Sequence, residues 1–103
     1  MVHYCRVVRV ELDGNRIHSE ADFHRQAAAL LNFGPYYGAN LDALWDRLSK
    51  DVQRPVRLVW NAARASRAAM GSRAFKRIED VLRAAAAEDV AYGWTDRFTY
   101  QLA

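Results

Sequence analysis

The sequence predicts an α/β fold, a small three-stranded parallel sheet packed with about four helices. Three segments, near residues 8–12, 55–60 and 98–102, alternate apolar and polar residues with the two-residue period of a β-strand. Between them, apolar residues recur at helical spacing. Strands separated by helices need crossover connections, so the three strands are expected to run parallel. The 103 residues show no linker or repeat, and we expect a single domain over residues 1–103.

The first strand ends near Leu12. Val8, Val10 and Leu12 share one of its faces, and the turn-forming tripeptide Asp-Gly-Asn then breaks the pattern. Ser19 can start a helix, because its side-chain oxygen can accept one of the unpaired backbone N–H groups of the first turn. The recurrence of apolar residues after it predicts a helix over about 20–31.

A connector and a short helix come next. Gly34 marks the end of the first helical pattern. The connector over 35–39 carries two neighbouring tyrosines, and Asn40 after it is a residue type favoured at the N-cap of a helix. The sequence therefore predicts a short helix over about 41–49.

The second strand begins at Pro55, and proline is tolerated at the first residue of a strand. Val56, Leu58 and Trp60 share one face of it. Trp60 is expected to be a core residue.

Two helices, a loop and a strand complete the chain. The helices are expected over about 62–70 and from Ser72 onward. The second of them places four apolar residues on one side: Phe75, Ile78, Leu82 and Ala85. The segment 90–96 is the least regular part and predicts a loop, in which Trp94 can be exposed. Alternating residues near 98–102 then predict the closing strand.

Cysteine content and hydropathy indicate the compartment. Cys5 is the only cysteine, so no disulfide can form within the chain, which fits a reducing environment. The longest apolar runs are a few residues long, far short of the roughly 20 needed to cross a bilayer. The first residues have the pattern of an alternating strand rather than that of a signal peptide. We therefore expect a cytoplasmic protein without a membrane segment.

No catalytic, metal or cofactor site can be recognised in the sequence. The histidines do not stand at metal-ligand spacing and are expected to be surface or capping residues: His3, His18 and His24. Ser66 and Ser72 lack a nucleophile motif, and no glycine-rich phosphate loop is present. The expected protein is not an enzyme and needs no cofactor.

Charge is distributed unevenly along the chain. The formal net charge is +3, with 6 Lys/Arg against 7 Asp/Glu in residues 1–51 and 9 against 5 in residues 52–103. Such a basic half fits a solvated helix surface or, alternatively, a module that binds RNA or DNA in a salt-sensitive manner. That alternative would use eight cationic residues: Arg54, Arg57, Arg64, Arg67, Arg73, Lys76, Arg77 and Arg83.

The short helix over 41–49 combines an apolar face with an acidic one. At 100° per residue, one face carries Leu41, Leu44 and Leu48, and the adjoining face carries Asp42, Asp46 and Ser49, with Trp45 at the border. Asp42 lies in the first turn, where the helix dipole stabilises a carboxylate. Asp46 lies in mid-helix, and like charges four residues apart destabilise a helix by a few tenths of a kcal/mol. From chemistry alone, the pair fits a structural or a binding role.

Residues 36–46, YYGANLDALWD, resemble the signature YYGxNLDALWD of the barstar family of small intracellular ribonuclease inhibitors. The resemblance extends over most of the chain. Residues 17–23 look like the family's entry into its first helix, 55–60 like its second strand and 81–88 like its last helix. The loop over 90–96 and the extreme N-terminus are peculiar to this chain.

The resemblance implies a barstar-like fold and an inhibitor that inserts this helix and the preceding loop into the active site of a ribonuclease. Asp46 would occupy the substrate-phosphate site, Asp42 would pair with a cationic loop, and Tyr36 would pack against the catalytic region. The other implied contact residues are Tyr37, Gly38, Asn40 and Trp45. The chemistry is consistent, because guanidinium groups form strong, directional bonds to carboxylates.

The implied partner is a secreted, basic, barnase-like microbial ribonuclease or a related toxin nuclease. The protein would then act as its antidote or immunity protein, monomeric when free and without a direct nucleic-acid partner. Two positions depart from the family pattern. Ala84 stands where the family has a second acidic contact, and Asp51 where it has a tryptophan. The sequence pI near 9.4 should also weaken long-range attraction to a basic enzyme.

Overall fold

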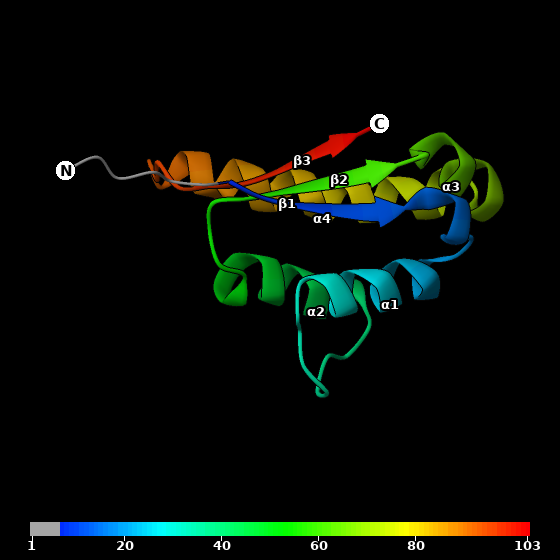
Figure 1. Ribbon diagram of the computed structural model, residues 1–103, viewed down its shortest axis with the longest axis horizontal. Coiled ribbons are helices and arrows are strands. Elements are labelled where there is room, and N and C mark those ends of the chain that lie inside the picture. Colours follow the sequence, from blue (N-terminus) through cyan, green and yellow to red (C-terminus); the bar gives the residue numbers. More distant parts are fainter. Residues whose placement is uncertain (1–6) are drawn as a thin grey trace.

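The computed structural model describes residues 7–103, which form a three-stranded parallel sheet with helices packed on it (Figure 1). His3 and Cys5 lie outside the described residues. The elements are β1 (Val8–Asp13), the 3₁₀ helix η1 (Gly14–Arg16), α1 (Glu20–Leu30), α2 (Leu41–Asp46), the π-helical turn η2 (Arg47–Asp51), β2 (Val56–Asn61), α3 (Ala63–Met70), α4 (Ser72–Ala91) and β3 (Phe98–Leu102). The predicted fold class is confirmed.

The sheet has β2 at its centre, flanked by β1 and β3, and both neighbours run parallel to it. Val56 of β2 pairs with Val8 of β1 and with Phe98 of β3. Helices lie in both connections between neighbouring strands. Crossover connections therefore produce the parallel order, as the alternation of strand and helix patterns predicted.

One face of the sheet carries the core and the other is open to solvent. The core face consists of even-numbered strand residues, among them Leu12, Val56, Leu58, Trp60 and Phe98. On the other face Arg9, Glu11, Arg57 and Gln101 are exposed, and Val59 of the central strand is the buried exception. In Figure 1, α4 lies behind the sheet and α1 and α2 lie below it. The period-two pattern of the strands follows from this difference between the faces.

Helix α1 begins with the predicted cap. The Ser19 hydroxyl oxygen accepts a hydrogen bond from the N–H of Asp22 at 3.2 Å, and the Asp22 carboxylate accepts one from the N–H of His18 at 2.9 Å. That backbone hydrogen bond, together with the Arg25 guanidinium at 2.8 Å, lowers the pKa of Asp22. The start of α1 is thus held by two reciprocal side-chain bonds to backbone N–H groups.

The predicted end of the helix over 41–49 is wrong. The α-helix stops at Asp46, and a π-helical turn continues the coil to Asp51. Arg54 explains the change, because its guanidinium donates to the carbonyl oxygen of Leu48 at 2.5 Å. That carbonyl oxygen therefore has a partner outside the helix, and the last turn can widen.

The predicted loop over 90–96 begins too early, since α4 runs to Ala91. The helix extends because Asp89 is fully buried and held by a side chain from another segment, so its last turn is fixed. The turn then ends at Gly93, whose φ of 73° is a conformation that glycine adopts without strain.

Gly14 lies where the chain passes the end of β2. A Cβ atom at this position would come within 2.2 Å of the carbonyl oxygen of Asn61 and 2.4 Å of that of Ala62. The buried Ser66 hydroxyl donates to the Gly14 carbonyl oxygen at 2.8 Å and accepts from the indole N–H of Trp60 at 3.0 Å. This close approach admits only glycine, and it places Trp60 in the core as predicted.

Candidate protein-binding surface

Helix α2 has a buried side that fixes it to the core. Leu44 and Leu48 are fully buried, and Leu41 and Trp45 are partly buried and pack against the same cluster. Burial of a leucine side chain contributes about 1.5–3 kcal/mol. The leucine face predicted from the helical wheel is confirmed, and it orients the opposite face outward.

Asp42 and Asp46 are exposed, one turn apart on the outer side of α2. Asp42 lies in the first turn of the helix. The Asp46 carboxylate lies 3.8 Å from the ammonium group of Lys50, and 62% of the Asp46 side chain is exposed. An exposed pair of this kind contributes only about 0–1 kcal/mol, so a stronger cationic partner can replace Lys50 at little cost.

The two tyrosines of the connector differ in their surroundings. Tyr36 is 90% exposed. Tyr37 is half-buried, its ring centroid lies 4.8 Å from that of Phe33, and its hydroxyl lies 2.6 Å from Nδ1 of His24. Burial, assisted by the nearby Glu20 carboxylate, raises the pKa of the Tyr37 hydroxyl. Tyr36 is therefore available to a partner, whereas Tyr37 holds the connector against α1.

The expectation that His24 is a surface or capping residue is wrong. His24 is only 2% exposed, and its Nε2 lies 3.0 Å from the Glu20 carboxylate, one turn earlier on α1. With Glu20 on one ring nitrogen and Tyr37 on the other, the buried imidazole is fully hydrogen-bonded. The spacing of four residues between Glu20 and His24 was the signal in the sequence. His18 is exposed near the start of α1.

Asn40 and Gly38 shape the junction between the connector and α2. The Asn40 side-chain oxygen accepts a hydrogen bond from the N–H of Ala43 at 2.8 Å, which confirms the predicted N-cap. A Cβ atom at Gly38 would lie 3.4 Å from the Ala43 Cβ and 3.4 Å from the Asn40 amide nitrogen. Both residues are exposed at the edge of the surface, and their contacts are with the chain itself.

The predicted contact residues thus form one surface at the start of α2, which we call the acidic surface (Tyr36, Asp42 and Asp46) with its supports Tyr37, Gly38, Asn40 and Trp45. A family model described as Barstar (barnase inhibitor) matches residues 7–101. The chain belongs to the barstar family. A relative from Bacillus subtilis (strain 168), named "Putative ribonuclease inhibitor YrdF", is 36% identical over 74 residues, which cover 72% of this chain and 77% of that protein.

The two departures from the barstar pattern are exposed positions. Asp51 pairs with Arg47 at 2.9 Å, at the end of the π-helical turn. Ala84 lies on α4 and presents only a methyl group to solvent. The Asp51 carboxylate is thus engaged within the chain, and Ala84 offers no charge, so this member of the barstar family has fewer free carboxylates near α2.

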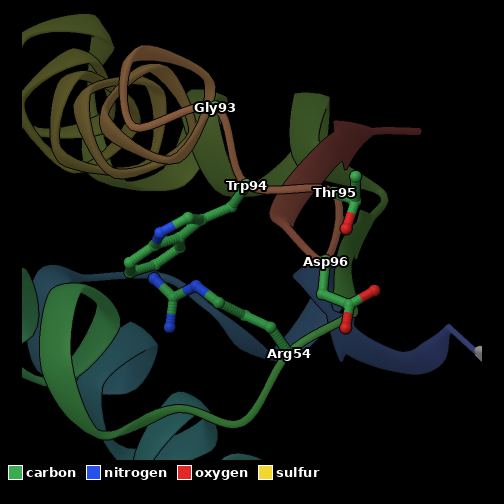
Figure 2. A pocket seen from close by; sticks show the side chains of 5 residues that line it. All are labelled: Arg54, Gly93, Trp94, Thr95 and Asp96. Carbon is green, nitrogen blue, oxygen red and sulfur yellow. The ribbon is translucent and has the colours of Figure 1, made fainter.

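Arg54 is not an exposed cation, contrary to its place in the nucleic-acid alternative. Its side chain is 11% exposed, and it forms a 2.6 Å ion pair with the fully buried Asp89. It also donates to the carbonyl oxygen of Val52 at 2.7 Å. Figure 2 shows the Trp94 ring over the guanidinium, which lies 5.3 Å from the ring centroid. Trp94 is 42% exposed and covers this ion pair, which ties the end of η2 to the end of α4.

Other kinds of site receive no support along residues 7–103. That part of the chain has no group of three or more His, Cys, Asp or Glu side chains arranged to hold a metal ion. It also has no helix that combines the length and the apolar composition needed to span a membrane.

Proposed function

We propose that this protein inhibits a barnase-like ribonuclease by placing the acidic surface in the nuclease active site. The observation that carries the proposal is the pair Asp42 and Asp46, exposed beside Tyr36 on a helix whose other side is fixed by buried leucines. The barstar family supports a ribonuclease as the partner. In this role the chain catalyses nothing, and it acts as an antidote in the compartment where the nuclease is made.

Local charge supports the proposal despite the basic net charge. Residues 36–46 contain two aspartates and no lysine or arginine, whereas the whole chain has a formal charge of +3. A ribonuclease must concentrate positive charge in its active site to hold a polyanion. Asp46 can accept short, charge-assisted hydrogen bonds from those cations, because its only ion pair among the described residues is the weak one to Lys50. The contact is therefore complementary where it forms, and long-range steering is weak.

Asp46→Ala should weaken binding to the inhibited nuclease by about 2–5 kcal/mol, mainly through faster dissociation. This is the cost of truncating one partner of a buried, hydrogen-bonded charge pair, a range to which complexes of this family contribute. Asp42→Ala should cost less, because part of its role is at the helix terminus, and Tyr36→Ala should fall between the two. Inhibition of RNA cleavage is measured first for a panel of small basic microbial ribonucleases, including barnase, and dissociation constants are then determined for the enzyme that is inhibited.

Asp80→Ala is the matched control. Asp80 is a helical carboxylate paired with a lysine four residues away, as Asp46 is, but it lies on α4. Asp80→Ala should bind the nuclease as wild type does, and all four variants should change the free energy of unfolding by only about 0.5 kcal/mol. If Asp46→Ala binds as tightly as wild type, insertion of the acidic surface into the active site is wrong for this protein.

A further inference from the structure

The cationic side chains of the second half are used differently in the fold. Arg54 is buried in its ion pair, and Arg57 lies on the open face of the sheet, where it donates to the Thr99 hydroxyl at 3.5 Å. Lys76 and Arg83 form ion pairs with carboxylates of α4 itself. Four arginines remain exposed and form no ion pair among residues 7–103: Arg64, Arg67, Arg73 and Arg77.

These four arginines lie on two helices that pack against each other, α3 and the first turns of α4, and we call them the α3–α4 basic surface. The Arg67 guanidinium donates to the Ser72 hydroxyl at 3.4 Å, which links the two helices at their junction. Figure 1 shows α3 beyond the end of β2, away from α2 and from the connector that precedes it. The basic surface is therefore separate from the acidic surface.

Nothing in the neighbouring sequence neutralises this charge. Residues 52–78 contain seven lysines and arginines and no aspartate or glutamate. Arg73 and Arg77 lie one turn apart on α4, and like charges at this spacing destabilise a helix by a few tenths of a kcal/mol. The first turn of α4 also has no acidic residue and no side-chain cap. The fold carries this concentration of charge without internal compensation, which indicates an external anion.

We propose that the α3–α4 basic surface binds the phosphate backbone of double-stranded nucleic acid. A duplex carries one negative charge per about 1.7 Å of axis, so a surface of four guanidinium groups can meet several phosphates at once. Guanidinium matches phosphate through paired hydrogen bonds. Duplex RNA and duplex DNA present this same chemistry, and the experiment distinguishes them.

The surroundings of the arginines favour a duplex over other polyanionic partners. Phe75, the aromatic residue of this corner, is 7% exposed, so the surface offers no platform on which single-stranded bases can stack. Leu102, 38% exposed, borders Arg64 and Arg67, and no other large apolar side chain among the described residues is exposed there. A membrane-binding or protein-binding surface needs a larger apolar component. Contact is thus made through charge alone.

This surface replaces the expectation of no direct nucleic-acid partner with a defined site, and it does not depend on the acidic surface. If the proposed inhibition also holds, the two surfaces place the inhibitor on the polymer that its target cleaves. The two functions can be separated by variants that alter one surface at a time.

The test compares two sets of four substitutions in the full chain. The first set is Arg64→Gln, Arg67→Gln, Arg73→Gln and Arg77→Gln, and the control set is Arg9→Gln, Arg25→Gln, Lys50→Gln and Arg57→Gln. Every substituted side chain is exposed, each set removes four positive charges, and glutamine preserves helix propensity. Affinity is measured by fluorescence anisotropy with a labelled duplex RNA, a duplex DNA and a single-stranded RNA of mixed sequence. Circular dichroism checks that both proteins are folded.

Wild type should bind a duplex at 50 mM salt and lose about a hundredfold in affinity by 200 mM, as four phosphate contacts require. The first set should lose at least tenfold in affinity at 50 mM, and the control set about twofold. The ratio of RNA to DNA affinity then identifies the source of the duplex. Four results would overturn the proposal: no duplex binding at 50 mM, equal losses in both sets, tighter binding of the single strand, or tighter binding to phosphatidylserine vesicles than to either duplex. Nuclease inhibition by the first set should equal that of wild type, so failure of either proposal is recognised separately.

Discussion

Replacing Asp89 by alanine should destabilise the fold by about 3–5 kcal/mol, the cost of removing one partner from a buried ion pair. The Asp89 carboxylate accepts hydrogen bonds from Arg54 Nε at 2.6 Å, from Arg54 Nη2 at 3.1 Å and from the N–H of Phe98 at 2.7 Å. Alanine leaves a guanidinium that is 11% exposed without a counter-ion and a buried backbone N–H without an acceptor. A domain of this size has a total stability of about 5–15 kcal/mol, so the loss is a large fraction of it.

A double-mutant cycle separates the ion pair from the rest of this cluster. Arg54→Met keeps most of the side-chain stem but leaves the Asp89 charge unpaired, and it should also cost about 3–5 kcal/mol. In Arg54→Met/Asp89→Ala neither charge is left alone, so the double variant should cost at least about 2 kcal/mol less than the sum of the single losses. Asp89→Asn retains an acceptor for the Phe98 N–H and should lie between wild type and Asp89→Ala.

Urea unfolding, followed by tryptophan fluorescence and by far-ultraviolet circular dichroism, measures these differences. Asp80→Ala, on the outer side of the same helix, serves as the control and should stay within about 0.5 kcal/mol of wild type. A loss below about 1 kcal/mol for Asp89→Ala, or additive losses in the cycle, would refute the reasoning. If Asp89→Ala does not fold, the comparison of Asp89→Asn with wild type still decides it.

Two further substitutions test the close approach at Gly14 and the orientation of the tyrosines. Gly14→Ala should destabilise by about 1–3 kcal/mol or more, because its Cβ would clash with the carbonyl oxygens of Asn61 and Ala62; an unchanged thermal midpoint would contradict the packing. Tyr37→Phe should cost about 1–3 kcal/mol by leaving His24 Nδ1 without its partner, whereas Tyr36→Phe should stay within about 0.5 kcal/mol. Equal unfolding free energies for the two tyrosine variants would show that the inward and outward assignments are wrong.

The elements that were predictable from sequence are those whose side chains report burial directly. The alternation of Val10, Leu12 and their neighbours predicted β1 because one face of the sheet is wet. On α4, the steps from Phe75 to Ala85 predicted the buried stripe because every residue in it is apolar. The acidic face of α2 followed from the same helical geometry, since Leu44 and Leu48 fix the opposite face.

Polar residues with distant partners could not be placed in this way. Asp89 continues the spacing of three and four residues from Leu82 and Ala85, yet a carboxylate at a buried position is only stable with Arg54, which lies 35 residues away. His24 likewise needs the hydroxyl of Tyr37, 13 residues away. A sequence pattern reports the face of a helix but not which remote side chain meets it.

The connector shows the same limit on a smaller scale. Tyr36 and Tyr37 are neighbours in a segment without a period, so no pattern distinguishes the residue that points outward from the one that packs on α1. The π-helical turn after Asp46 was also hidden, because it depends on the hydrogen bond from Arg54 to the Leu48 carbonyl oxygen.

Scaffold and contact residues alternate within the segment 36–46, and this divides its codons into two groups for engineering. Tyr37 and Asn40 hold the segment in place, through His24 and the start of α2. Tyr36, Asp42 and Asp46 project from the finished surface, with most of their side-chain atoms in solvent. A display library that randomises only these three positions should retain the fold in nearly every clone, whereas one that randomises all eleven residues would lose most clones to misfolding. Retargeting this inhibitor to a different enzyme is therefore a search over three codons.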